Sequence, residues 1–270
     1  MKQRAYTVFQ GRAGDRNDLA MAGAMAIGRA LAQKTGIHTT VIGTPAPALG
    51  KSWQEELEAA MPDLAAMRDR LDDVLASGAV SVAATSRCTV SLATLPVVVR
   101  HRPSACIVWF DAHGDLNTPT STTTGYLGGL VLTAPAGLWD SGLGDGLDLD
   151  QIVLVGQREL DPFEQELIDG HGVAHVRPGA GLESELRRAV AGRPVYMHLD
   201  CDVLNPGIVP TEYAPDGGLS LEELNACCRV IAEHELVGIE IAEFQNVWHP
   251  HGEPVSPEPL LDALAPVLAL

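Results

Sequence analysis

Three metal-binding side chains follow one predicted strand at alternate positions. The apolar segment 105–110 (ACIVWF) runs directly into Asp111, His113 and Asp115. Residues two apart in an extended chain point to the same side, so these side chains are expected to share one face. In parallel α/β sheets the carboxyl ends of the strands open onto the crevice where ligands bind, so a functional site is expected here.

A second predicted strand, 194–199 (PVYMHL), ends in the same way in Asp200 and Asp202. Either acidic cluster alone is also compatible with helix capping or a solvated surface. Four carboxylates in one cleft would repel one another and have raised pKa values unless cations neutralised them. Carboxylates with one imidazole suit Mn²⁺ or Fe²⁺, and two such ions activate water. We therefore predict a two-metal hydrolytic site.

The elements that position these residues alternate between short apolar runs and helical patterns. Strands are predicted at 5–9, 38–43, 79–85, 105–110, 151–157, 194–199 and 235–244. Helices are predicted near 17–34, 53–76, 90–101, 162–170, 182–191, 221–234 and 257–268. Pro62 is expected to break the second helix into two pieces. Continuous apolar strands are typical of sheets covered on both faces, so we predict one α/β domain, residues 1–270, with three α/β/α layers and a mostly parallel central sheet.

Composition limits the possible functions. The chain of 270 residues has 46% hydrophobic residues, as expected of a globular protein with a large core. Its net charge of −17, with 18 basic against 35 acidic residues, argues against nucleic-acid binding. Five cysteines without a C-x-x-C pair indicate a reducing compartment, and no signal peptide or membrane span is evident. We expect a cytoplasmic protein that acts on a small molecule, either as a monomer or as a homo-oligomer.

The segments 111–119 (DAHGDLNTP) and 198–206 (HLDCDVLNP) closely resemble the two metal-binding motifs of the ureohydrolases, the arginase and agmatinase family. The resemblance covers nearly the whole chain and implies an arginase-like fold with two Mn²⁺ ions. Asp115 would also orient the attacking water and pass a proton to the departing amine. The residues that match the family's metal ligands are Asp111, His113, Asp115, Asp200 and Asp202.

The same resemblance implies a free amino acid with a guanidino group as substrate. Asn117 and Thr124 match positions that hold the α-carboxylate. Asp161, together with Glu164 through water, matches those that hold the α-amino group. Glu243 matches the acid that pairs with the guanidinium, a strong and oriented arrangement. Each of these residues is also compatible with an ordinary polar position in a loop.

Two departures from the family pattern bear on the substrate. Cys88 stands where the family has a first metal-binding histidine; it would be a softer ligand that favours zinc or iron, or simply a small buried residue. Gly128 stands where arginases have a histidine that relays protons. His198 is expected to support the site rather than to bind metal.

These departures resemble the members of the family that cleave Nω-hydroxy-L-arginine to hydroxyurea and L-ornithine in antibiotic biosynthesis, and this substrate is our leading expectation. Its hydroxylated nitrogen is less basic than that of arginine, so it would tolerate the loss of an acid/base group. A plain arginase or related guanidinobutyrate-type enzyme, and a catalytically weakened amino-acid-binding homologue, remain as alternatives.

Overall fold

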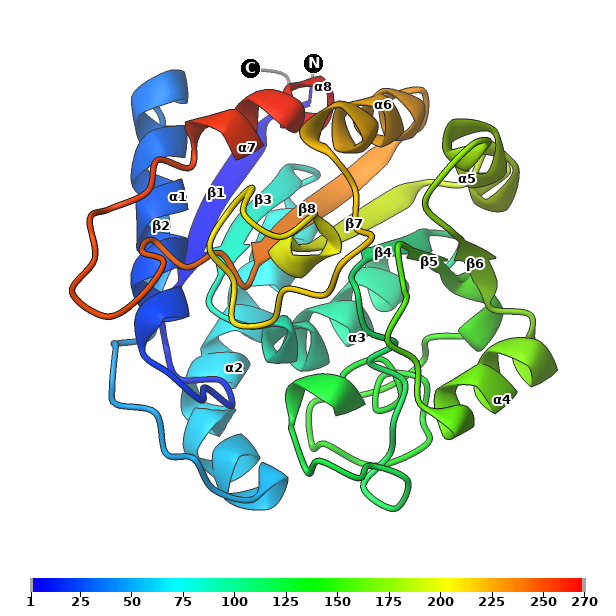
Figure 1. Cartoon of the computed structure of the whole chain (residues 1–270), viewed down its shortest axis with the longest axis horizontal. Helices are drawn as coiled ribbons and strands as arrows, with labels where there is room; N and C mark the ends of the chain where they lie inside the picture. The colour runs from blue at the N-terminus through cyan, green and yellow to red at the C-terminus, as the bar shows by residue number, and fades with distance from the viewer. Residues whose placement is uncertain (1, 269–270) are drawn as a thin grey trace.

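The predicted strands come together in one sheet, which the computed structural model describes within residues 2–268 (Figure 1). All the neighbouring strands in it run parallel. The order across the sheet is β2-β1-β3-β8-β7-β4-β5-β6. The strands are β1 Arg4–Phe9, β2 Thr40–Ile42, β3 Val80–Thr85, β4 Cys106–Phe110, β5 Ile152–Val155, β6 Ala174–Val176, β7 Val195–Asp200 and β8 Leu236–Ala242.

Helices cover both faces of the sheet, which confirms the predicted α/β architecture (Figure 1). Helices α1, α5, α6, α7 and α8 contribute to the apolar core on one face, and α2, α3 and α4 to the core on the other. The helices are α1 Leu19–Thr35, α2 Trp53–Ala76, α3 Ser91–His101, α4 Pro162–His171, α5 Leu182–Val190, α6 Leu221–Ala232, α7 Glu258–Ala263 and α8 Ala265–Leu268. Among the described helices, none combines the length and hydrophobicity that crossing a bilayer requires.

The strand β4 shows why a continuous apolar run is needed here. Cys106, Val108 and Phe110 belong to one core, and the alternating Ile107 and Trp109 belong to the other. Side chains on both sides of the strand are therefore fully buried, as expected for a parallel strand covered by helices. This burial fixes the register, because a shift by one residue would exchange the two faces.

Two details of the sequence prediction were wrong or incomplete. Helix α2 continues through Pro62 rather than breaking there. Pro62 and Glu58, whose carbonyl loses its helical partner, both lie on the exposed side of α2, where water can satisfy that carbonyl. The short edge strand β6 was not predicted, because its three residues form no apolar run.

Candidate active site

The carboxyl ends of four neighbouring strands, β3, β8, β7 and β4, border a cavity of about 500 Å³. Such a crevice is where ligands bind in open α/β sheets. Each strand end contributes at least one side chain that the sequence analysis singled out. The predicted residues that line the cavity are Cys88, His113, Asp115, Asn117, Thr124, Asp161, Glu164, Asp200, Asp202 and Glu243.

Two of these residues have backbone conformations that are rare for residues other than glycine. The φ angle of Asp115 is 51° and that of Glu243 is 63°. A left-handed conformation costs about 1 kcal/mol or more in a residue with a Cβ and persists only where the surroundings impose it. Such strain concentrates at functional sites, which agrees with the place of both residues in the cavity.

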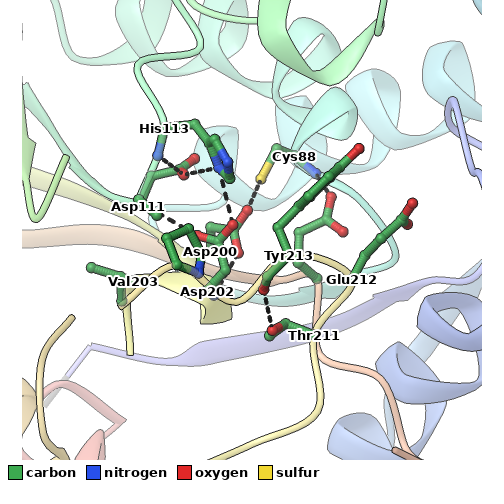
Figure 2. Close-up of polar contacts among 12 residues, drawn as sticks. Cys88, Asp111, His113, Asp200, Asp202, Val203, Thr211, Glu212 and Tyr213 are labelled. Carbon is green, nitrogen blue, oxygen red and sulfur yellow. Dashed lines mark hydrogen bonds and ion pairs between the residues drawn. The ribbon is translucent and has the colours of Figure 1, made fainter. Parts of the chain in front are cut away.

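His113 joins the two acidic motifs, as Figure 2 shows. Its Nδ1 lies 3.3 Å from Asp111 Oδ1 and 3.0 Å from Asp202 Oδ2. Backbone amides fix the carboxylates as well: the Ala112 N–H donates to Asp202 Oδ1 at 3.0 Å, and the Asp202 N–H donates to Asp200 Oδ1 at 2.7 Å. The two strand ends therefore present one preorganised cluster rather than separate acids.

Cys88 lies beside the same cluster, in the short helix η1 Cys88–Val90 that follows β3. Its Sγ is 3.2 Å from Asp200 Oδ2 (Figure 2). Burial, and then the charge of Asp200, raise the pKa of the Cys88 thiol well above its usual value. Without a cation beside it, this sulfur therefore carries its proton and donates to Asp200.

The carboxylates show the electrostatic cost of their crowding. Burial, and then the charge of Asp111, raise the pKa of Asp115 well above its ordinary value. Burial, and then the charge of Asp202, do the same for Asp200. Burial lowers the pKa of His113, but hydrogen bonds to Asp111 and Asp202 outweigh this effect and raise it to about 12. The cluster attracts positive charge, and a bound divalent cation would replace these protons.

The donor atoms are close enough to hold two cations. Three groups of three side chains each have their ligand atoms within 4.8 Å of one another. Two of the groups share Asp111, so this carboxylate could contribute to both ions. Mostly carboxylate oxygens, with one imidazole and one thiol, suit divalent transition metals. The groups are Cys88, Asp111 and Asp115; Cys88, Asp200 and Glu243; and Asp111, His113 and Asp202.

His198 lies behind the metal cluster, where a supporting role was expected. Its Nε2 is 3.2 Å from Cys88 Sγ, and its Nδ1 is 3.2 Å from Glu240 Oε2. The imidazole stacks on Trp109 with ring centroids 3.6 Å apart, and the Trp109 indole N–H donates to Asp111 Oδ2 at 3.1 Å. This buried layer orients two of the candidate ligands, as outer partners of metal ligands do elsewhere.

At another part of the cavity wall, polar side chains form a separate group. Asn117 Nδ2 donates to Asp161 Oδ2 at 2.9 Å. The Glu164 carboxylate accepts from the Leu116 and Asp161 amides at 3.0 and 2.9 Å. Thr124 also lines the cavity, and its Oγ1 accepts from a neighbouring backbone amide. The group offers both an anionic and a neutral partner for the polar end of a ligand.

Comparison with known proteins agrees with this geometry. A sequence model of the Arginase family matches residues 15–253. The chain belongs to the arginase family. The predicted activity, hydrolysis of a guanidino C–N bond at a binuclear metal site, is the activity of this family. The N(omega)-hydroxy-L-arginine amidinohydrolase of Streptomyces lavendulae is 39% identical over 96% of this chain and 95% of its own.

Solved arginase structures have the same fold. Arginase from Bacillus caldovelox matches with a TM-score of 0.83 at 21% identity, covering 99% of this chain and 98% of the other. Arginase from Entamoeba histolytica, in complex with L-ornithine, matches with a TM-score of 0.86 at 18% identity, covering 100% and 99%. The prediction of an arginase-like fold is therefore confirmed.

The space beside Gly128, where the resemblance to arginases places a proton-relay histidine, is occupied by another side chain in this protein. A Cβ added to Gly128 would lie 2.5 Å from Cε1 of Tyr126, closer than atoms can approach. The Tyr126 ring also lines the cavity, with Tyr213 edge-on at 6.3 Å between centroids. No side chain fits at residue 128 unless this ring moves, so the pocket is built around an aromatic surface instead of an imidazole.

Sequence reasoning missed a buried group of charges around Glu243. Arg87 is fully buried and pairs with Asp15, Glu212 and Glu243 at 2.6–2.9 Å. Burial raises the pKa of Glu243 to about 7, although Arg87 and the Cys88 N–H favour its ionised form. A signal was available, because an arginine between the buried strand β3 and the apolar helix α3 needs partners when it is buried.

Proposed function

We propose that this chain hydrolyses Nω-hydroxy-L-arginine to hydroxyurea and L-ornithine with two Mn²⁺ ions. The observation that carries the proposal is the Cys88 thiol, 3.2 Å from Asp200, at the position where the family resemblance puts a histidine. The relative from Streptomyces lavendulae, 39% identical over nearly the whole chain, is named for this substrate. Gly128 supports the proposal as well, because a better activated substrate has less need of a proton relay.

The candidate ligands divide between the two ions by their proximity. Cys88, Asp111 and Asp115 would hold one ion, and Asp111, His113 and Asp202 the other, with Asp200 beside both groups. When bound, the ions supply an attacking water of lowered pKa and stabilise the charge that develops in the transition state. Carboxylate ligands favour Mn²⁺, whereas the thiol would also accept zinc or iron. Ligation needs Cys88 reduced, which is consistent with its free thiol.

The rest of the cavity would hold the amino acid in a fixed direction. Glu243 would pair with the hydroxyguanidine, and the group around Asp161 would hold the α-amino and α-carboxylate groups. These two ends of the cavity then set the length and charge of the substrate. The α-amino partners would be Asp161 and, through water, Glu164, and the α-carboxylate partners would be Asn117 and Thr124.

Asp115 would carry the proton that the reaction transfers. It would accept a proton from the attacking water and donate it to the ornithine nitrogen as that nitrogen leaves. The bond that forms joins the water oxygen to the guanidine carbon, and the bond that breaks joins this carbon to the ornithine nitrogen. The oxygen remains in hydroxyurea, so water is the only co-reactant.

A parallel assay tests this function. The protein reconstituted with Mn²⁺ should release ornithine faster from Nω-hydroxy-L-arginine than from L-arginine, and agmatine should not be cleaved. Asp202→Asn, which removes one charge from the metal cluster, should abolish the activity and serves as the control for contaminating enzymes. Equal or faster turnover of arginine would identify a plain arginase. Tight binding of either amino acid without turnover would identify a binding protein.

A further inference from the structure

Arg87 places a permanent positive charge directly behind the Glu243 carboxylate. Its Nη1 donates to Glu243 Oε2 at 2.7 Å and to Glu212 Oε2 at 2.6 Å. Its Nε donates to Asp15 Oδ1 at 2.9 Å, and its Nη2 donates to the Asn17 carbonyl at 3.1 Å. Arginine stays charged in proteins, and these contacts fix the guanidinium plane. The charge therefore cannot move away when a ligand enters the cavity.

Both oxygens of Glu243 are engaged by the protein before a substrate arrives. Oε1 accepts the Cys88 N–H at 3.0 Å, and Oε2 accepts Arg87. A carboxylate has about four acceptor positions, so positions remain that can face the cavity. Arg87 is fully buried, whereas Glu243 lines the cavity, so a guanidine bound there would share the carboxylate with Arg87 from the opposite side.

Two cations that share one carboxylate repel each other. At a separation of about 7 Å and an effective dielectric constant of about 20, this repulsion weakens binding on the order of 10- to 50-fold. The guanidinium of arginine is charged at every pH that the protein meets. The electron-withdrawing hydroxyl of Nω-hydroxy-L-arginine makes its guanidine less basic, so that its neutral form is accessible.

We propose that Arg87 is a specificity-determining residue that selects the less basic hydroxyguanidine over the permanently charged guanidinium of arginine. The inference rests on the proposed function, because it takes Glu243 as the partner of the reacting group. It assigns the preference between the two substrates to a fixed charge rather than to the size of the pocket.

Glu212 offers a way to vary the effect of this charge without removing Arg87. Its carboxylate pairs with the same Nη1 atom that binds Glu243, and its side chain is 14% exposed, whereas that of Asp15 is fully buried. Neutralising Glu212 leaves the positive charge of Arg87 less compensated. Discrimination against a cationic substrate should then become stronger, which is the opposite of the effect of removing Arg87.

The test compares the ratio of kcat/KM for Nω-hydroxy-L-arginine to that for L-arginine. Arg87→Gln should lower the ratio on the order of 10- to 50-fold, mainly through a lower KM for arginine. Glu212→Gln should raise the ratio by about 3-fold or more, by the same electrostatic effect. Arg187→Gln, which breaks the exposed pair with Glu233, is the matched control and should leave the ratio unchanged.

A second readout separates charge from general damage to the site. Guanidinium and urea are planar head groups of similar shape, one cationic and one neutral, and both are tested as competitive inhibitors over the same concentration range. Arg87→Gln should strengthen inhibition by guanidinium relative to urea, and Glu212→Gln should weaken it. A variant that only loosened the pocket would change both inhibitors alike.

The inference is overturned if the wild type prefers hydroxyarginine but the ratio in Arg87→Gln stays within about twofold of it. If circular dichroism shows that Arg87→Gln does not fold, an unchanged ratio in Glu212→Gln would overturn the inference instead. A wild-type protein that cleaves arginine as fast as hydroxyarginine would instead overturn the proposed function, so the two failures are distinguishable.

Discussion

The Cys88 thiol and the Asp200 carboxylate lie in hydrogen-bonding contact, 3.2 Å apart, and join the segment after β3 to the end of β7. Burial and the charge of Asp200 raise the pKa of this thiol well above its usual value, so a metal must displace a tightly held proton to bind the sulfur. A histidine at this position would bind as a neutral ring. A soft thiolate also suits Mn²⁺ less well than an imidazole does, so the Cys88 side of the site should hold this ion less firmly than the His113 side.

Replacing Cys88 by histidine should tighten the binding of the more weakly held ion. We expect Cys88→His to retain more Mn²⁺ per chain than the wild type after gel filtration in metal-free buffer, and Cys88→Ser to retain less. Inductively coupled plasma mass spectrometry gives the metal content directly. Cys227→Ser, a buried cysteine in α6 away from the site, is the control.

This prediction concerns ligation rather than folding. Identical metal content in the wild type, Cys88→His and Cys88→Ser would show that the sulfur is not a ligand. In that case Cys88 would be only a small buried residue beside the cluster.

The crowded carboxylates predict how the stability of the metal-free protein depends on pH. Asp115 and Asp200 have folded-state pKa values well above the ordinary value near 3.8, so the folded chain binds more protons than the unfolded chain above that value. The free energy of unfolding therefore falls as the pH rises from about 4 through the raised pKa values. Bound Mn²⁺ replaces these protons and opposes the loss.

Thermal melting tests this dependence. The increase in Tm between EDTA and Mn²⁺ should be larger at about pH 8 than at about pH 6, because the metal-free protein is less stable at the higher pH. A ligand at about 100 times its Kd contributes about 2.7 kcal/mol to the free energy of unfolding. Asp200→Asn should flatten the pH dependence in EDTA, whereas Asp145→Asn in an exposed loop should not. A Tm in EDTA that rises with pH over this range would contradict the predicted sign.

Glu243 should control how kcat/KM depends on pH on the acid side of the optimum. Burial raises its pKa to about 7, and only the ionised carboxylate can hold the guanidine of the substrate. Bound cations shift this pKa downward, so kcat/KM at saturating metal should fall as the pH decreases through an inflection at or below 7. Glu243→Gln should remove that inflection and lower kcat/KM about 30-fold or more, the cost of losing one buried charge partner. The same inflection in Glu243→Gln would assign it to another group.

Asp161 should act on the α-amino group of the substrate. Asparagine also suits the N-cap position that precedes α4, so Asp161→Asn removes the charge with little effect on the helix. KM for the amino-acid substrate should rise about 10- to 100-fold, the effect of losing a hydrogen bond to a charged group. Inhibition by 5-guanidinopentanoate, which has no α-amino group, should be unchanged. Asp169→Asn, on the exposed side of the same helix, is the control.

The sequence was sufficient to place most of the candidate site, because the relevant side chains follow strands. Asp111 and Asp200 come at the ends of β4 and β7, and the parallel order of the sheet brings these ends together. Continuous runs of apolar residues were enough to predict the strands that are buried on both faces. The prediction failed at β6, an edge strand of three residues, and at Pro62, where the exposed side of α2 tolerates a missing hydrogen bond.

The sequence could indicate that Arg87 needs partners, but not which residues these are. Asp15, Arg87 and Glu212 are far apart in the sequence, and only the folded chain shows that they share one buried cluster. Likewise, the sequence shows that Gly128 replaces a histidine but not that the ring of Tyr126 fills the space. Tertiary contacts of this kind depend on how loops cross the sheet edge, and periodicity carries no information about them.

The central claim is most directly tested by identifying the products of Nω-hydroxy-L-arginine hydrolysis in oxygen-18 water by mass spectrometry. The Mn²⁺-loaded protein should yield unlabelled L-ornithine and hydroxyurea with one oxygen-18 atom, since water attacks the guanidine carbon and the ornithine nitrogen leaves. Citrulline with hydroxylamine would show that the other C–N bond breaks, and no products from a metal-loaded protein that cleaves arginine would show a different substrate. Either result would contradict the proposed function.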